Sequence, residues 1–279
     1  MSDLADLAIL IPASNEAALI GACLTAVLAS NPVPAPVVRL VVIANGCRDN
    51  TAGVAAGFAP MAAAKGWDLQ VLDLAEGGKT RALAAGETAA PARVTLYLDA
   101  DVTVSPALLA QTYHALSQAD GPAYAAGKVR ITAQSFMSRL YARFWQQVPF
   151  MRDTVPGCGA FAMNAAGRAR FGQWPQIISD DTFVRLHFSP AERIALAAPY
   201  DWPIAEGLPA LIRVRRRQDH GVSQCAALYP HLNVNADPPP PPGYKRRMAL
   251  ADPLGFLVYA GVAIAVKLRR PDDAWVRSR

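Results

Sequence analysis

The feature that most constrains the fold is an alternation of apolar runs, polar loops and helix-like segments over the first 120 residues. Short apolar or β-branched runs, which are typical of buried strands, occupy residues 7–11, 37–44, 69–74 and 94–98. Segments with helical spacing follow them at residues 17–30, 51–65, 80–90 and 108–119. This alternation predicts an α/β fold in which helices flank a mainly parallel sheet.

Polar side chains stand in the loops that follow these four strands. In sheets of this kind ligands bind outside the carboxyl ends of the strands, which lie at a common edge. We therefore expect a single crevice to collect Asn15, Glu16, Asn45, Asp49, Lys79, Asp99 and Asp101.

The second half of the chain is less regular. A strand is expected over residues 123–131, and helical spacing of apolar residues predicts a helix over residues 136–148. That helix either packs on the sheet or lines an acceptor groove with Trp145. A glycine-bearing loop covers residues 157–160, and five consecutive prolines at 238–242 form a stiff spacer.

Asp99 and Asp101 directly follow the fourth expected strand. Residues i and i+2 of a strand point to the same face, and two carboxylates on one face suit Mg²⁺ or Mn²⁺. Lys79 is expected nearby, so a diphosphate ligand bridged by the ion would fit. An acidic turn without a metal is the alternative, and the position after the strand favours the metal site.

A second carboxylate pair, Asp180 and Asp181, follows an apolar approach. Adjacent carboxylates repel, which raises one pKa and suits a general base. The alternative is a helix over residues 182–188 whose N-cap is Ser179 or Asp180. One residue can cap the helix while the other catalyses.

A basic run follows at residues 213–217, with His220 close behind. Arginines pair bidentately with phosphate oxygens, so Arg215 and Arg217 could clamp a pyrophosphate. A solvated charged face is the alternative. His220 is a candidate metal ligand, although a single histidine is more often not a ligand.

The net charge of +5 is concentrated at the C-terminal end, since residues 1–204 sum to −1 and residues 205–279 to +6. The uncharged segment 254–266 would span about 20 Å as a helix, less than the roughly 30 Å of a hydrocarbon core. Basic residues flank it at 245–247, 267, 269 and 270. Such a helix, over about residues 245–270, either lies on an anionic membrane surface or packs on the rest of the protein.

The four cysteines are scattered, and no basic segment precedes the first apolar run. Both features predict a protein of the reducing cytoplasm without a signal peptide. A membrane contact through the C-terminal helix would place it at the inner face of the cell membrane.

Taken together, these motifs resemble glycosyltransferase family 2, the inverting nucleotide-sugar transferases with the GT-A (Rossmann-like) fold. The resemblance covers roughly residues 5–220. It is carried, in the family's order, by Ile11-Pro12-Ala13-Ser14-Asn15-Glu16, the strand and loop at 42–51, Gly78-Lys79, Leu98-Asp99-Ala100-Asp101-Val102, residues 157–160 and Asp180-Asp181.

The resemblance implies a role for each matching position. Pro12, Ser14 and Glu16 would lie along the base and ribose of the nucleotide, with Asn45 at the base-reading position and Lys79 near the nucleotide. Asp101 would be the principal ligand of Mn²⁺ or Mg²⁺, with Asp99 at the ribose or the metal. Asp181, beside Asp180, would be the catalytic base. Arg215 and Arg217 would stand near the family's usual phosphate-contacting segment.

The resemblance also implies a domain organisation. Residues 1–235 would form the GT-A catalytic domain, with a nucleotide-binding half over about 1–120 and an acceptor half over about 121–235. Residues 236–279 would form the proline linker and the basic, partly apolar C-terminal helix.

Three departures from the family pattern limit what it implies. Ser14 replaces a common aromatic residue, Asn45 replaces the usual aspartate, and no Gln-x-x-Arg-Trp segment occurs. The first two put base stacking and uracil specificity in doubt. The third favours a single transfer over processive polymer synthesis.

The resulting prediction is a metal-dependent, inverting transfer of a sugar from a nucleoside-diphosphate sugar to an acceptor hydroxyl. The acceptor itself is not identified, and membrane contact would make a lipid-linked one accessible. A sugar nucleotidyltransferase is disfavoured because the first loop, residues 11–16, has no glycine. A non-catalytic protein of the same fold is the other alternative. Nucleic-acid binding is not expected, since it would leave the carboxylates without a role.

Overall fold

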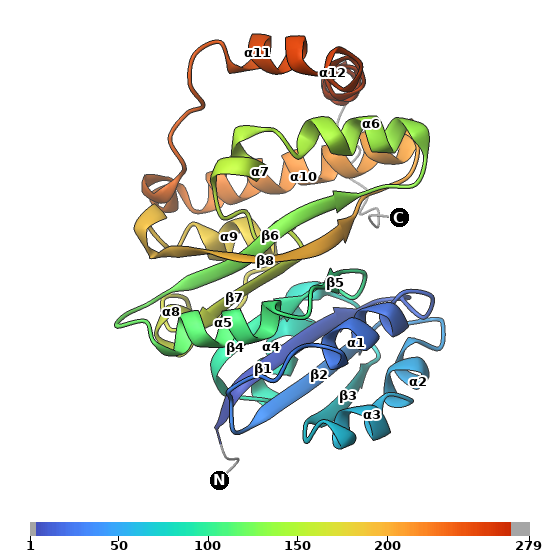
Figure 1. Cartoon of the computed structure of the whole chain (residues 1–279), viewed down its shortest axis with the longest axis vertical. Helices are drawn as coiled ribbons and strands as arrows, with labels where there is room; N and C mark the ends of the chain where they lie inside the picture. Colours follow the sequence, from blue (N-terminus) through green and yellow to red (C-terminus); the bar gives the residue numbers. More distant parts are fainter. Residues whose placement is uncertain (1–3, 269–279) are drawn as a thin grey trace.

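The computed structural model describes residues 4–268 and forms one mixed α/β structure (Figure 1). The four expected strands of the first half are all present, with helices between them. Their bounds are β1 (Ala5–Ala13), α1 (Ile20–Leu28), β2 (Val38–Asn45), α2 (Thr51–Ala56), α3 (Ala59–Ala64), β3 (Asp68–Leu74), α4 (Lys79–Ala89), β4 (Ala92–Leu98), β5 (Thr103–Val104) and α5 (Leu108–Ser117).

The second half adds three strands and the remaining helices. The expected strand and helix at 123–131 and 136–148 are confirmed, whereas β7, β8 and the long α10 had no clear periodic signal. Their bounds are β6 (Tyr124–Thr132), α6 (Phe136–Trp145), α7 (Pro149–Asp153), β7 (Ala160–Asn164), α8 (Ala165–Arg168), α9 (Asp180–Arg185), β8 (Arg193–Pro203), α10 (Leu208–Leu228), α11 (Tyr244–Ala251) and α12 (Pro253–Leu268).

All eight strands belong to one sheet in the order β3-β2-β1-β4-β7-β6-β8-β5. The β1–β2, β1–β4 and β2–β3 pairs are parallel, which confirms the prediction for the first half. Strand β7 then runs antiparallel to both β4 and β6. A single sheet therefore runs through both halves, and the division near residue 120 stays a prediction.

One helix expected over residues 51–65 is instead two short helices, α2 and α3. Pro60 lies in the first turn of α3. Proline has no backbone N–H and cannot bond to the carbonyl four residues earlier, so the preceding helix cannot continue through it. The prediction of one continuous helix was wrong for this reason.

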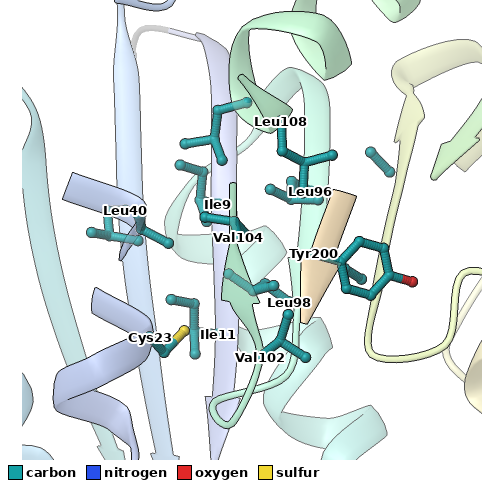
Figure 2. Close-up of a cluster of buried hydrophobic side chains, with 14 of the residues drawn as sticks. Ile9, Ile11, Cys23, Leu40, Leu96, Leu98, Val102, Val104, Leu108 and Tyr200 are labelled. Carbon is teal, nitrogen blue, oxygen red and sulfur yellow. The ribbon is translucent and has the colours of Figure 1, made fainter. Parts of the chain in front are cut away.

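Alternate residues of β1 enter the two cores on opposite sides of the sheet, as a strand requires. Leu7, Ile9 and Ile11 belong to the core that contains residues of α1 and α5. Figure 2 shows Ile9 and Ile11 in this core with Cys23 of α1 and Leu108 of α5. Ala8 and Leu10 belong to the other core, which contains residues of α4 and α9. The sheet thereby fixes the starts of α4 and α9 relative to the ends of β1 and β4.

The C-terminal helix α12 packs against α6 and α10, at the end of the molecule away from β1–β3 (Figure 1). Tyr141 of α6, Leu211 of α10 and Val262 of α12 form a small buried cluster. Within residues 4–268, no helix is both long and apolar enough to cross a membrane. Arg269 and Arg270, which were expected to flank this helix, lie outside the described residues.

Candidate active site

The polar site begins where β1 and β2 end side by side. The buried side chain of Asn45 donates from Nδ2 to the carbonyls of Ala13 (2.9 Å) and Ile43 (3.1 Å). Its Oδ1 accepts from the Gly78 amide (3.0 Å). Asn45 therefore joins the ends of β1 and β2 to the start of α4, and its amide is fully used by the backbone.

The loops after β1 and β2 are tied together by Asp49 and Thr51. The Asp49 carboxylate accepts from the Ala17 amide (3.1 Å) and from the Thr51 hydroxyl (2.5 Å). The Glu16 amide in turn donates to the Thr51 hydroxyl (2.9 Å). The Thr51 hydrogen bond lowers the pKa of Asp49, so this carboxylate is an anionic anchor. From the sequence, Asp49 was expected in the crevice without a role, and no role was expected for Thr51. The signal for this pair is an aspartate two residues before a threonine that begins a helix.

Asn15 adds a further tie to these loops. It adopts a left-handed backbone, with φ of 56°, and its side chain accepts from the Arg48 amide (2.6 Å). Asparagine is one of the few residues that adopts this conformation readily. Pro12 lies near the end of β1, and Ser14 directly follows this strand. The structure therefore places Pro12, Ser14, Glu16 and Asn45 along one edge of the sheet.

An ion cluster at this edge joins residues far apart in sequence. The Lys79 ammonium lies 2.9 Å from Asp99 Oδ1 and 3.1 Å from Asp180 Oδ2. The Lys79 and Asp99 side chains are 38% and 34% exposed, whereas that of Asp180 is only 6% exposed. One ammonium thus serves two carboxylates, with the buried one beneath.

Burial and the unequal number of charges together shift the pKa values in this cluster. Burial alone would lower the pKa of Lys79, but Asp180 and Asp99 raise it above its usual value. Burial also raises the pKa of Asp180 to about 6, because Lys79 offsets only part of the cost and Asp181 and Asp99 add negative charge. Lys79 gains from two partners, while Asp180 must share one.

Asp99 and Asp101 lie in the turn after β4, which ends at Leu98. The argument from strand alternation was therefore wrong, although both residues directly follow β4 and Asp99 does pair with Lys79. The Asp99 amide donates to the carbonyl of Gly159 (2.8 Å). Gly159 has φ of +73°, and a Cβ there would come within 2.8 Å of Trp202. The glycine loop before β7 thus holds the turn that carries Asp99.

Asp180 and Asp181 form the first turn of α9. Ser179 occupies the N-cap position but makes no side-chain cap hydrogen bond, so the capping alternative is not realised through Ser179. The Asp181 carboxylate is half-buried and accepts from the Thr182 amide (2.7 Å). Asp180 is thus the buried ion-pair partner of Lys79, and Asp181 is the more accessible carboxylate of the pair.

Arg215, Arg217 and His220 all lie on α10. Arg215 donates to the Tyr259 hydroxyl (3.0 Å) and pairs with Asp219 (2.8 Å). Its contacts therefore join α10 to α12. His220 is exposed. Within residues 4–268, no hydrogen bond or ion pair joins these three residues to Lys79, Asp99 or Asp180, and their roles in binding stay predictions.

The donor chemistry of Asp99 and Asp101 fits a hard divalent cation. In the described range 4–268, no three His, Cys, Asp or Glu residues gather in a way that could hold a metal. Mg²⁺-type sites, however, are commonly built from one or two carboxylates completed by substrate phosphates. The two aspartates fit a site of that kind, and His220 is not part of a preformed one.

Comparison with known proteins gives a family and a fold. Residues 8–167 match the family described as Glycosyl transferase family 2. Comparison with curated proteins gives no match.

Solved structures share the fold at low sequence identity. A mannosyltransferase, PcManGT from Pyrobaculum calidifontis, solved with GDP-Man and Mn²⁺, aligns with a TM-score of 0.58 at 18% identity, over 97% of this chain and 77% of that one. TarS 1-349 of S. aureus gives 0.57 at 11% identity, over 93% and 72%. Glucosyl-3-phosphoglycerate synthase from Mycobacterium tuberculosis, solved with Mn²⁺, UDP and glucosyl-3-phosphoglycerate, gives 0.53 at 14% identity, over 80% and 79%.

Proposed function

The chain belongs to glycosyl transferase family 2 and is a glycosyltransferase, and from this premise we propose that its donor is a nucleoside-diphosphate sugar and its acceptor a hydroxyl. The observation that carries the proposal is the cluster of Lys79, Asp99 and Asp180 at the carboxyl edge of the sheet, with Asp181 beside it. A cation and several carboxylates at such an edge suit a diphosphate leaving group and a base.

The donor would lie along the edge formed by the loops after β1, β2 and β4. Pro12, Ser14 and Glu16 would line the base and ribose, and Lys79 would face the phosphates. Asn45 would act through the backbone that it holds, since its amide is already bonded to Ala13, Ile43 and Gly78. Of the proteins that share the fold, PcManGT was solved with GDP-Man, and TarS 1-349 was solved with UDP and with UDP-GlcNAc, which supports a donor of this class.

Asp101 and Asp99 would hold Mn²⁺ or Mg²⁺ together with the donor phosphates. When bound, such an ion neutralises charge on the phosphate leaving group. Of the proteins that share the fold, PcManGT and the glucosyl-3-phosphoglycerate synthase were solved with Mn²⁺. Lys79 would add a second, fixed positive charge on the side of Asp99 and Asp180.

Asp181 would act as the general base. It would take the proton of the acceptor hydroxyl while that oxygen bonds to the anomeric carbon. The bond from this carbon to the diphosphate oxygen would break, and its electron pair would leave with the nucleoside diphosphate. One displacement without a covalent enzyme intermediate inverts the anomeric centre. Asp180 would position the base and Lys79 rather than take the proton, because it is buried and ion-paired.

We propose a single transfer, because no Gln-x-x-Arg-Trp segment occurs in the sequence. A lipid-linked acceptor stays a prediction. We expect a membrane-bound acceptor to approach the half of the molecule that contains α6, α10 and α12.

The test is donor turnover by the full chain with UDP-, GDP-, dTDP- and CDP-sugars, in Mn²⁺, Mg²⁺ or EDTA. We expect nucleoside diphosphate to be released from one donor only when metal is present, and a metal-dependent rise in Tm with that donor. Asp101→Asn should lose both effects, while Asp120→Asn, an exposed carboxylate after α5, should keep them. Turnover that is equal in EDTA, or retained by Asp101→Asn, would contradict the metal assignment. With an acceptor in hand, NMR of the product anomer tests inversion.

A further inference from the structure

The C-terminal helix α12 has two distinct faces. Its inner face is held by specific contacts: Asp252, at its start, is buried and accepts from Arg143 of α6 at 2.9 and 2.5 Å. Tyr259 stacks on Tyr141 at 5.2 Å, and Val262 is almost fully buried. The helix is therefore docked on the protein by one side, as one of the two sequence alternatives predicted.

The opposite side of the C-terminal helices is apolar and open. Leu254, Leu257, Ile264 and Leu268 of α12 are 57–80% exposed, and Leu250 at the end of α11 is 74% exposed. The positions on α12, together with the exposed Gly261, recur at spacings of three and four residues, so they form one stripe along the helix. Exposed leucines in a contiguous stripe mark an interaction surface rather than ordinary surface variation.

The charges around this stripe all have one sign. Lys245, Arg246 and Arg247 of α11 and Lys267 of α12 are exposed. The only carboxylate in residues 238–268 is Asp252, which is buried and paired with Arg143. The outer face, which we define as Leu250, Leu254, Leu257, Ile264 and Leu268 with these four basic residues, therefore offers apolar area and positive charge and exposes no carboxylate.

We propose that the outer face binds an anionic membrane surface, with α12 lying in the plane of the interface. Leucines on one side and basic residues around them are the pattern by which helices lie in the headgroup region. At sixteen residues, α12 is about 24 Å long and does not reach across a hydrocarbon core of about 30 Å. An in-plane position also leaves its inner-face contacts with α6 and α10 intact.

Charge selects the membrane over a second copy of the chain as the occupant. In a symmetric dimer through this stripe, the four basic residues of one copy would face the four of the other, with no exposed carboxylate on these segments to balance them. Anionic lipids supply the missing negative charge.

This inference goes beyond the proposed function and does not depend on it, since vesicle binding needs no donor, metal or acceptor. Its consequence for the reaction is a class of acceptor. A chain held at a bilayer through α12 would act on a hydroxyl compound carried at the membrane surface, such as a lipid-linked one.

The experiment is co-sedimentation of the full chain with vesicles of phosphatidylcholine alone or with about one third phosphatidylglycerol. Lys245→Gln/Arg246→Gln/Arg247→Gln should weaken binding to anionic vesicles about a hundredfold, since each basic residue near the surface contributes roughly fivefold. Leu254→Gln/Leu257→Gln should weaken it about tenfold or more through lost apolar contact. All five residues are exposed, and unchanged far-UV circular dichroism and Tm would verify folding.

Matched controls remove exposed apolar and basic side chains outside α11 and α12. Met61→Gln takes away an exposed apolar side chain of α3, and Arg93→Gln/Lys128→Gln takes away two exposed charges. Both should bind anionic vesicles as the native chain does.

Three outcomes would overturn the proposal. The first is no binding to anionic vesicles at low salt, or equal binding to neutral ones. The second is native binding by both outer-face variants. The third, measured by light scattering without lipid, is a dimer that Leu254→Gln/Leu257→Gln converts to a monomer, because the stripe would then belong to a second copy.

Discussion

Helix α9 carries an ion cluster at each end, and the two clusters have opposite composition. At its start, one ammonium, Lys79, serves the carboxylates of Asp99 and Asp180. At its end, one carboxylate, Asp237, serves two guanidiniums, Arg185 at 2.7 Å and Arg193 at 2.8 Å. In both clusters the single ion is well paired and the two like ions must share it.

In each cluster the pKa of a buried ion that shares its partner is shifted towards the neutral form, upwards for the carboxylate and downwards for the guanidinium. Burial and neighbouring carboxylates raise the pKa of Asp180 to about 6. Burial and the neighbouring Arg185 lower the pKa of Arg193, opposed by Asp237. The clusters differ in access, since Lys79 and Asp99 are about one third exposed, while the side chains of Arg185 and Arg193 are 7% and 2% exposed.

The two clusters have different roles because they differ in access. The open cluster, which consists of Lys79, Asp99 and Asp180, keeps an excess of negative charge at the edge where a cation and a diphosphate would enter. The closed cluster, Arg185, Arg193 and Asp237, is shielded from solvent, and it ties the segment that leads into residues 238–242 to the end of α9 and the start of β8. Arg193 also donates to the carbonyls of Phe188 and Asn235, which completes this anchor.

The largest effect is expected from the open end of α9. Asp181→Asn should lower kcat by on the order of 10²–10⁴-fold, the usual contribution of a general base, because an amide cannot take the acceptor proton. The Tm should stay close to that of the native chain, since Asp181 is half-buried and its hydrogen-bond acceptor is retained. Steady-state kinetics and calorimetry measure the two quantities. Asp153→Asn, an exposed carboxylate of α7, is the control, and native kcat in Asp181→Asn would remove the base assignment.

At the closed end, the expected effect is on stability. Asp237→Asn leaves two buried guanidiniums without a counter-charge, and breaking a buried pair in this way costs about 3–5 kcal/mol. Urea unfolding measures the loss. Asp201→Asn breaks an exposed pair with Arg130 and should cost about 0–1 kcal/mol. If the two variants were equally stable, the closed cluster would not be the anchor that we describe.

A smaller effect on stability is expected at Asn45, whose neutral side chain joins the ends of β1 and β2 to the start of α4. Asn45→Asp would restore the family's usual residue, but a carboxylate cannot donate to the carbonyls of Ala13 and Ile43. Leaving these buried acceptors opposite a negative charge should destabilise the protein by about 1–3 kcal/mol. Chemical denaturation tests this, with Asn31→Asp, at an exposed position after α1, as the control. A native-like stability of Asn45→Asp would show that the position is not fixed by its backbone hydrogen bonds.

The first half of the fold was predictable because its strands and helices each leave a local periodic signal. Runs such as residues 7–11 and 94–98 are buried on both sides, and the polar loops must then meet at one edge. From the strand pattern, only the proximity of Lys79 and Asp99 could be anticipated. The addition of Asp180 depends on α9, which contacts α10 and contributes Phe183 and Val184 to the core that also contains residues of α4.

Other parts left no such signal. The short β5 and the five-residue β7 are set by their partners in the sheet rather than by their own pattern. The closed cluster joins residues 185, 193 and 237, and no spacing rule connects them. The two faces of α12 were both present in the sequence, but only packing on α6 and α10 decides which residues are left outside.

The smallest effect concerns the pH dependence of the open cluster. Because the folded-state pKa of Asp180, about 6, lies above its ordinary value of 3.8, this group stabilises the fold below pH 4, and that contribution is lost as the pH rises through 6.

Asp180→Asn keeps the shape of the side chain and removes the buried charge, while Lys79 retains its pair with Asp99. Its Tm should therefore exceed the native value at pH 8 by a few degrees, since about 1 kcal/mol corresponds to roughly 2–4 °C in a domain of this size. The difference should shrink towards pH 4, where native Asp180 is itself neutral. A calorimetric series from pH 4 to 8 measures this, with Asp120→Asn as the control. The opposite result would be a Tm of the variant that falls below the native Tm at pH 8 by more than it does at pH 4. The ion pair with Lys79 would then outweigh the cost of burial, and the open cluster would be as much a structural anchor as the closed one.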